Sequence, residues 1–308
     1  MSNLPEARTT PVSTSVSDGT EENQAAEASL WADAWRSLRK NPWFLISGTL
    51  LLLMLAMALF PQLFATYDPR ECFLSRNRQT PSAEHWFGTD IQGCDYYSRI
   101  IYGARSSIAV GFIVSLGVLL ISIVLGLTAG YFGSWIDSII SRVTDMVFAV
   151  PFILGALVFL NVISTRGVRE VAFVLIIFMW PTMTRLMRSS VISVVNTEYV
   201  TAARALGAGH VTIMRRHILP NSLGPVIGYA TVFTGIVIGA EATLTYLGVG
   251  LQLPAISWGL QLSDAKGYLT SFPHLLVFPL IFVSVTVFAF MTLGDAVRDA
   301  LDPKSKKK

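Results

Sequence analysis

The sequence contains little charge and few cysteines. Asp, Glu, Lys and Arg together make up 14% of the 308 residues, whereas a soluble protein usually carries about 25%. Apolar residues make up 52% of the chain, and the mean hydropathy is +0.55. This balance excludes an ordinary soluble globular protein. The net charge is only +3, which gives no indication that the protein binds nucleic acid.

The sequence also lacks the motifs of common catalytic and nucleotide-binding centres. It has no G-x-x-x-x-G-K-[ST] phosphate-binding loop, no H-E-x-x-H and no nucleophile elbow. Its four histidines are scattered along the chain, and no CxxC or histidine cluster accompanies the two cysteines. We therefore expect no catalytic, cofactor-binding or metal site in this chain. If the protein uses ATP, another chain must hydrolyse it.

Long apolar runs are present instead. A run of about 20 apolar residues is enough to cross the hydrocarbon core of a bilayer as a helix. We predict an all-α, polytopic membrane protein whose six transmembrane helices are Phe44–Phe64, Ser106–Tyr131, Ile136–Val162, Val171–Met187, Val226–Leu247 and Leu275–Leu293. A proline within the third span, Pro151, should bend it.

Lys and Arg set the expected orientation. If the N-terminus is cytoplasmic, the inner segments are 1–43, 132–135, 188–225 and 294–308. These segments and the span edges beside them hold more Lys and Arg than the outer ones, as the positive-inside rule requires. We predict a cell-membrane protein with both termini cytoplasmic. The long polar leader before the first span should leave that span as a retained anchor.

The chain divides into four predicted parts. Residues 1–29 should form a disordered cytoplasmic leader. Residues 30–103 hold an amphipathic helix, the first span and an external loop, and residues 104–295 form one core of five spans. Residues 296–308 are a basic tail. Trp31, Trp35 and Leu38 share one face of the amphipathic helix, which indicates contact with lipid headgroups or simply the start of the first span.

Both cysteines, Cys72 and Cys94, lie in the predicted external loop. An oxidising compartment allows them to form a disulfide bond, although two unpaired thiols are the alternative. The single possible intrachain bond would close a loop of about 20 residues, which is worth roughly 3 kcal/mol in the chain-entropy model.

Charged residues within the spans are few. Glu241 lies in the fifth span, where an isolated carboxylate is costly, so it either lines a pathway or subunit interface, or is hydrogen-bonded to a neighbouring loop. Arg142 and Asp145 are three residues apart in the third span and should form an ion pair. Gly235 and Gly239 in the fifth span should permit close helix packing.

A polar, basic stretch, residues 196–221, lies between the fourth and fifth spans. We call it the cytoplasmic knob. Asn196 or Thr197 should cap a short helix that ends at Gly207 and Gly209. A second short helix, Val211–Arg216, should follow and stop at Pro220. The knob is either a surface that takes force from a soluble partner or a plain amphipathic connector.

The knob contains a recognisable pattern. Ala202-Ala203-x-x-x-Gly207 is followed, after nine residues, by His217-Ile218-Leu219-Pro220. This pattern resembles the "EAA loop" of ABC importer permeases, a coupling helix that docks on a cytoplasmic ATPase. The first position differs, since Thr201 stands where that family usually has Glu. The resemblance implies a coupling surface formed by Thr201, Ala202, Ala203, Gly207, Arg215, Arg216, Leu219 and Pro220.

Further motifs resemble the dipeptide/oligopeptide/nickel group, in its C-type permease. They are His85-Trp-Phe-Gly-Thr-Asp90 with Gly93-x-Asp95, Tyr102-Gly-Ala-Arg-Ser-Ser, Glu241-x-x-Leu-Thr-Tyr-Leu-Gly-x-Gly250, Ser257-Trp-Gly259 and Leu293-Gly-Asp-Ala-Val-Arg-Asp-Ala-Leu-Asp-Pro303. The resemblance covers about residues 30–303 and implies the type I ABC importer permease fold.

The resemblance also implies a function and partners. The chain would form a translocation path for dipeptides or oligopeptides with a homologous second permease subunit. Two cytoplasmic ATPase subunits, which bind ATP and Mg²⁺, would drive it, and an external solute-binding protein would deliver the peptide. The same fold importing nickel chelates, glutathione or another small solute is the first alternative. A membrane-embedded enzyme built around Glu241 and Asp145 is the second, although the predicted topology places these two residues near opposite faces.

Overall fold

The computed structural model describes residues 35–301. Over this range the regular structure is almost entirely helical, and β pairing is confined to two isolated bridges, Cys72 with Cys94 and Thr89 with Asp95. The α-helices are α2 (Pro42–Leu59), α3 (Tyr96–Phe132), α4 (Ser134–Ala149), α5 (Phe152–Val162), α6 (Val168–Val195), α7 (Glu198–Ala205), α8 (His210–Ile213), α9 (Leu219–Tyr246), α10 (Trp258–Ala265) and α11 (His274–Leu301).

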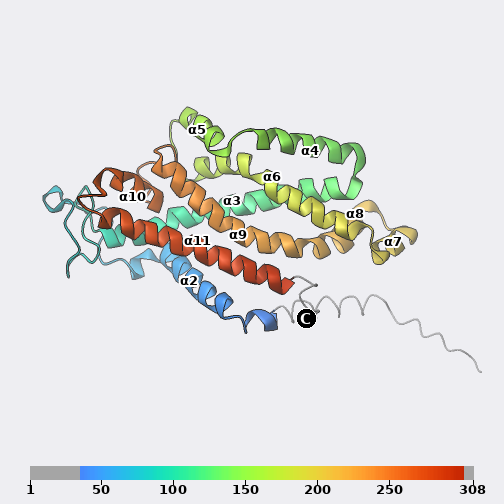
Figure 1. Ribbon diagram of the computed structural model, residues 1–308, viewed down its shortest axis with the longest axis horizontal. Helices are drawn as coiled ribbons and strands as arrows, with labels where there is room; N and C mark the ends of the chain where they lie inside the picture. Colours follow the sequence, from blue (N-terminus) through green and yellow to red (C-terminus); the bar gives the residue numbers. More distant parts are fainter. Residues whose placement is uncertain (1–34, 302–308) are drawn as a thin grey trace, which may run out of the picture.

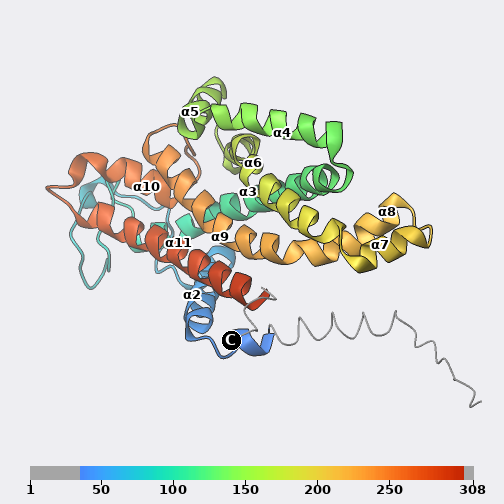
Figure 2. The ribbon, with the colours of Figure 1, turned by 45° about the vertical axis from the view of Figure 1, so that its right-hand side comes forward.

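The long helices run side by side and give the molecule two distinct ends. Helix α3 packs against α6 and α9, and α11 packs against α9 and α2. The loop before α3 lies with α10 at one end of this bundle, whereas α7 and α8 protrude at the other end (Figure 1; Figure 2). The segment predicted to be external and the knob predicted to be cytoplasmic therefore lie at opposite ends, as a transmembrane arrangement requires.

The predicted spans are present with different limits. Five helices are long and apolar enough to cross a membrane, and α4 with α5 adds a sixth span if the bent pair is counted as one. The break falls at Pro151, as predicted, but α5 is inclined to α4 by 81°. Proline removes a backbone donor and clashes with the preceding turn, so the helix does not continue through it.

Helix α3 begins ten residues before the predicted span and is 37 residues long. Its length is therefore about 55 Å, well beyond the hydrocarbon core of a bilayer. The carboxylate of Asp95 accepts a hydrogen bond from Ser98 N at 2.8 Å and caps the helix. Hydropathy cannot detect this extension, because the first turns of α3 are amphipathic and lie beside the external loop.

The prediction that Pro220 ends a helix is wrong. Helix α8 runs through a π-helical turn, Met214–Ile218, into α9, and Pro220 lies in the first turn of α9. In the π turn Leu219 N donates to Met214 O. The wider turn changes the hydrogen-bond register just before Pro220. The proline therefore lies in the first turn of α9, where a residue without a backbone N–H is tolerated.

Two hydrophobic clusters form the core. One lies among α3, α5, α6 and α9 and includes Leu160, Met183 and Met187. The other joins α2, the outer part of α3, α10 and α11 around Trp258. The second cluster therefore attaches the first span and the outer helix α10 to the long-helix bundle.

Glycines set the distance between the long helices. A Cβ atom on Gly126 would lie 2.6 Å from the Cβ of Met187 and 2.9 Å from Thr184 O, so α3 and α6 approach each other closely there. Gly235 lies in the same way against α11, where a Cβ would be 3.0 Å from Val287 O. The close packing expected from the glycines of the fifth span is present at Gly235, while Gly239 lies in ordinary contact with Val287.

The predicted Arg142–Asp145 ion pair is not the one that forms. Asp145 pairs with Arg185 of α6 at 2.6 Å, and Asp137 of α4 pairs with Arg188 of α6. Helix α6 lies beside α4 and offers guanidinium groups to both carboxylates, while Arg142 is exposed. Sequence spacing shows contacts within a helix but not this pairing between helices.

The amphipathic helix before the first span is only partly described. Residues 35–38 are helical, Leu38 is buried, and Trp35 is 53% exposed and contacts the ring of Phe44 edge-on. Trp31, the leader 1–29 and the tail from 302 onward lie outside the described residues.

The close contact of α3 with α6 gives a testable stability prediction. Gly126→Val should lower the free energy of unfolding by about 1–3 kcal/mol, because the side chain would overlap Met187 and the backbone of Thr184. Gly267→Val is the matched control, since a Cβ there meets nothing within 4 Å. Thermal unfolding in detergent should show a lower Tm for Gly126→Val alone; equal Tm values for both variants would contradict the packing described here.

Candidate functional site

The knob, residues 196–221, contains α7, a glycine turn, α8, the π turn and the first residues of α9. Helix α7 begins after Thr197, and Glu198 lies in its first turn, where the helix dipole favours an acidic side chain. Thr197 stands at the N-cap position, but its hydroxyl donates to Val194 O instead of capping α7. The knob protrudes from the bundle at the end opposite to the external loop (Figure 1).

Gly207 turns the chain between the two short helices. Its φ is +82°, in the left-handed region where a side chain is strained. Gly207 N bonds Arg204 O and Ala208 N bonds Ala203 O, so the turn also satisfies carbonyl groups at the end of α7. The sequence prediction that the chain turns at Gly207 is confirmed.

Buried side chains hold the knob on the bundle. Val200 of α7, Ile213 of α8 and Ile218 of the π turn are all fully buried in the first core cluster. His210 Nδ1 lies 2.7 Å from the hydroxyl of Tyr131 at the inner end of α3. These contacts allow the knob to move with the long helices as one body.

The outer surface of the knob is exposed and apolar at its tip. Leu206 is 88% exposed, beside Gly207, and Val211 is 62% exposed. Single exposed apolar side chains are common on protein surfaces, so the exposure of Leu206 and Val211 shows only that these side chains are accessible to a partner. The sequence analysis missed Leu206, although an apolar residue directly before the turning glycine was the available signal.

The predicted coupling residues are placed unevenly on this surface. Thr201, Ala202, Gly207, Arg215, Arg216 and Pro220 are exposed, and Ala203 and Leu219 are half-buried. Thr201 Oγ1 donates to Thr197 O at 3.2 Å, within its own helix. The exposed members are therefore available to a partner, whereas Leu219 packs against the core of the bundle.

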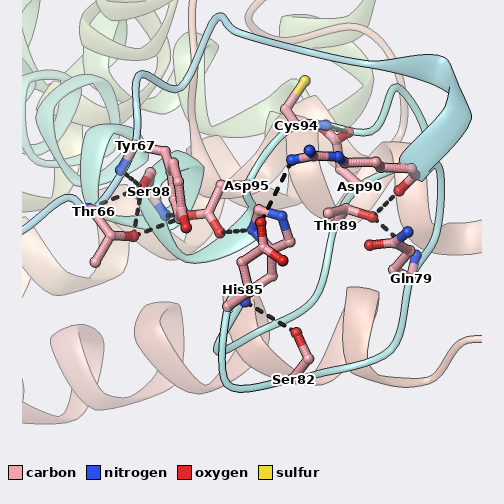
Figure 3. A network of polar contacts seen from close by, with 12 residues as sticks. Thr66, Tyr67, Gln79, Ser82, His85, Thr89, Asp90, Cys94, Asp95 and Ser98 are labelled. Atoms are coloured by element: carbon pink, nitrogen blue, oxygen red, sulfur yellow. Dashed lines mark hydrogen bonds and ion pairs between the residues drawn. The ribbon is translucent and has the colours of Figure 1, made fainter.

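The external loop is held by a disulfide bond and by a network of polar contacts, which Figure 3 shows. Cys72 and Cys94 are bonded, the pairing that their shared location predicts. Asp90 forms a buried ion pair with Arg99 of α3, and its other oxygen accepts hydrogen bonds from Gln92 N and Cys94 N. A buried charge that lost such a partner would cost several kcal/mol, so the loop and α3 are fixed to each other.

A second buried contact reinforces the start of α3. His85 Nδ1 lies 2.8 Å from Asp95 Oδ1, and the other oxygen of Asp95 caps α3 (Figure 3). His85, Asp90 and Asp95 are the ionisable residues of the external motif identified from the sequence. The motif thus connects the loop to α3, a role that its spacing alone did not indicate.

Helix α10 is fixed to the same end of α3. Trp258 Nε1 donates to Ile100 O at 2.9 Å, and Gln261 Nε2 donates to Arg99 O at 2.7 Å. The pKa of the Asp264 carboxyl on α10 is raised above its usual value because burial removes water from the group. The nearby positive charge of Arg99 offsets part of this rise. The external loop, α3 and α10 therefore form one polar assembly at the outer end of the molecule.

Glu241 is buried and connected to a loop. None of its surface is exposed, its Oε1 accepts from Thr245 Oγ1 at 2.8 Å, and Thr245 Oγ1 accepts from Leu251 N. Its Oε2 has no hydrogen-bond partner among residues 35–301. The carboxylate is therefore bonded within its own helix and reaches the following loop only through Thr245, so neither predicted role of Glu241 is decided.

Two protein-family models match this chain. Residues 122–307 match the family model for the binding-protein-dependent transport system inner membrane component. The chain belongs to this family. Residues 29–81 also match the N-terminal transmembrane domain of oligopeptide transport permease C. The protein is thus a multi-pass membrane permease subunit, and the resemblance drawn from the knob and the external motif is confirmed.

Several relatives are similar over nearly their whole length. The dipeptide transport system permease protein DppC of Alkalihalophilus pseudofirmus is 40% identical, over 92% of this chain and 93% of its own. The oligopeptide transport system permease protein OppC of Bacillus subtilis is 36% identical, over 100% of both chains. The glutathione transport system permease protein GsiD of Pectobacterium atrosepticum is 37% identical, over 90% of this chain and 92% of its own.

Solved structures agree on the fold. An inward-facing form of the MetNI methionine ABC transporter matches with a TM-score of 0.55 at 21% identity, over 66% of this chain and 96% of that chain. At this identity the match shows the fold alone. It places the described chain in the type I ABC importer permease fold, which was predicted from the sequence.

The disulfide bond is directly testable. Peptide mass spectrometry without reduction should find the Cys72 and Cys94 peptides linked in native membranes. The paired variant Cys72→Ser with Cys94→Ser should lower the free energy of unfolding by about 2–4 kcal/mol, because the unfolded chain regains loop entropy. Free thiols at both positions in native membranes would refute the bond.

Proposed function

We propose that this chain is the C-type permease subunit of an ATP-driven importer of dipeptides or oligopeptides. With a homologous second permease subunit it encloses the translocation path, and lipid surrounds the pair. Two cytoplasmic ATPase subunits bind ATP and Mg²⁺ and drive transport. An external solute-binding protein delivers the peptide. The chain itself is not an enzyme in this proposal.

Full-length similarity to peptide permeases is the observation that supports peptides as the substrate class. Dipeptide and oligopeptide permeases align with 90% or more of the chain at 36–40% identity. The similarity includes both the outer loop and the knob, so it is not confined to the common membrane core. A glutathione permease at 37% identity makes glutathione the second candidate substrate. Uptake assays with the two solutes distinguish these candidates.

The knob supplies the proposed connection to ATP hydrolysis. Its exposed tip, Leu206 and the adjoining face of α7, would seat in a groove of an ATPase subunit. The buried anchors Val200 and Ile213, with the contact of His210 to Tyr131, would transmit the displacement to α3 and α6. Closure of the ATPase pair around ATP would then rock the helix bundle between inward and outward access.

The alternative of a membrane-embedded enzyme gains no support from the positions of its two carboxylates. Glu241 is buried beside Thr245 near the outer end of α9, whereas Asp145 pairs with Arg185 at the side of the bundle. The two acids belong to separate contacts. A two-carboxylate centre needs both groups at one reacting bond, and this arrangement does not offer it.

The coupling role predicts a specific loss of function. Gly207→Val should leave membrane insertion intact, because Gly207 lies outside the spans, but it should tilt α7 relative to α8. A displacement of even about 1 Å at a functional contact can reduce a rate about a hundredfold. We expect a loss of this order in substrate-stimulated ATP hydrolysis by the reconstituted complex, with weaker copurification of the ATPase subunits.

Two control variants accompany this experiment, together with one further variant that should reproduce the loss. Gly209→Val should be tolerated, because Gly209 has φ of −68° and a Cβ there meets nothing within 4 Å. Thr201→Glu, which restores the usual family residue at an exposed position, should also be tolerated. Ala203→Asp, which puts a charge on α7, should behave like Gly207→Val. Normal assembly and uptake with Gly207→Val would show that the knob is not the coupling surface.

The proposed orientation puts both termini and the knob in the cytoplasm. A single cysteine introduced as Thr212→Cys, in a chain whose native cysteines are replaced by serine, should react with a membrane-impermeant maleimide only after the membrane is opened. Thr212 is exposed on α8, so its position does not prevent labelling. Labelling of intact cells at this position would overturn the orientation.

A further inference from the structure

A hollow of about 400 Å³, lined by both charged and apolar residues, opens at the end of the molecule that holds the external loop, beside the first turns of α3. Its walls are the Asp68–Arg70 segment, the 102–106 face of α3, and the 254–256 loop before α10. Binding sites for small ligands commonly have volumes of about 300–1,000 Å³. The hollow is therefore large enough for a small peptide.

Charges of both signs line the hollow. Arg105 and Arg70 provide guanidinium groups, and Asp68 provides a carboxylate. All three residues are exposed, and within the described chain neither arginine forms an ion pair. Asp68 Oδ1 accepts from Arg70 N at 2.9 Å, an interaction that leaves the second carboxylate oxygen and both guanidinium groups available to a ligand.

The walls of the hollow are fixed to one another through α3. The hydroxyl of Ser98 accepts hydrogen bonds from Thr66 N at 3.2 Å and Tyr67 N at 3.0 Å, which holds the segment leading to Asp68. On the other side, Ser107 Oγ accepts from Trp258 N at 3.3 Å, directly after the 254–256 loop. A ligand that enters this hollow would find its charged groups already placed, which lowers the entropic cost of binding.

The charge pattern identifies the class of ligand. A short peptide is a zwitterion, with an ammonium group at one end and a carboxylate at the other. Arginine binds carboxylates well because its planar guanidinium donates two parallel hydrogen bonds. An acidic protein surface or a simple anion would use the two arginines but would leave Asp68 without a partner of opposite charge. A concave site with both signs therefore matches a zwitterionic peptide.

We propose that this hollow receives the charged ends of a short peptide as it passes to the permease, with Arg105 and Arg70 binding its carboxylate and Asp68 its ammonium group. The proposal rests on the peptide-importer function proposed above and adds a substrate-contacting site to it. It also gives Arg105, the arginine of the Tyr102-Gly-Ala-Arg motif, a role in selecting peptides with free ends.

The test uses the reconstituted complex in proteoliposomes with its solute-binding protein. The solutes are the dipeptide Ala-Phe, its C-terminal amide and its N-acetyl derivative, each first shown to saturate the solute-binding protein. The wild-type complex should transport the unmodified dipeptide about tenfold faster than either derivative, the order expected for one charged hydrogen-bonded contact.

Arg105→Gln should slow the unmodified dipeptide toward the rate of its amide and reduce this discrimination, because Arg70 remains as the second carboxylate partner, while discrimination against the N-acetyl form remains. Asp68→Asn should have the converse effect, and Arg105→Lys should retain part of the preference. Arg169→Gln is the matched control, since Arg169 is an exposed arginine at the start of α6 and outside the hollow. It should leave all three rates unchanged.

Two results would overturn the proposal. One is an equal effect of Arg105→Gln on uptake of the dipeptide and of its amide. If that effect is only a change in the concentration of solute-binding protein needed for half-maximal uptake, Arg105 is a docking contact for that protein and does not bind the peptide. The other is no effect of either variant. Failure of the wild-type complex to import any peptide would instead refute the proposed function itself.

Discussion

The close approach of α3 and α6 determines where most of the described chain lies. Gly126 and Gly130 have no side chains, so the backbone of α3 can contact the backbone of α6. A Cβ atom on Gly126 would lie 2.9 Å from Thr184 O, and one on Gly130 would lie 3.0 Å from Arg188 O. In a bilayer, lipid chains are as apolar as the side chains, so helices associate through such close packing and not through the hydrophobic effect. The glycine face of α3 therefore permits the close packing that joins α3 to α6.

Helix α3 also connects the two polar ends of the protein. Its outer turns carry Arg99, which pairs with Asp90, and its inner end carries Tyr131, which contacts His210 of the knob. A helix of 37 residues is long enough to reach beyond both membrane surfaces. The knob thus contacts the inner end of α3, and the outer end of the same helix is bonded to the external loop and, through Trp258, to α10.

Much of this fold could be predicted from the sequence because its signals are local. The apolar runs located the long helices, Pro151 located the break between α4 and α5, and Gly207 located the turn of the knob. The errors concern features that depend on neighbours. The pairing of Asp145 with Arg185 depends on the placement of α6 beside α4, and the passage of the chain through Pro220 depends on a π turn.

The candidate sites divide in the same way. The alanines and Gly207 of the knob were found from their spacing, but the exposure of Leu206 follows from the tertiary position of α7 at the tip of the bundle. The external motif was found as a pattern, whereas its physical role became visible only when Asp90 was seen to pair with Arg99 across the start of α3. Sequence identifies residues that are unusual for their surroundings, and structure shows which of them act on one another.

Buried polar contacts and exposed charges have different consequences at the outer end. Asp90 with Arg99, and His85 with Asp95, are enclosed pairs, and separating a buried pair is costly, so they fix the backbone of the loop. Asp68, Arg70 and Arg105 are exposed and carry no such partner pairs within the described chain. Exposed charges contribute little to stability, so these three groups are not needed to hold the walls. The enclosed pairs keep the walls in place, while the exposed groups remain available to a charged solute.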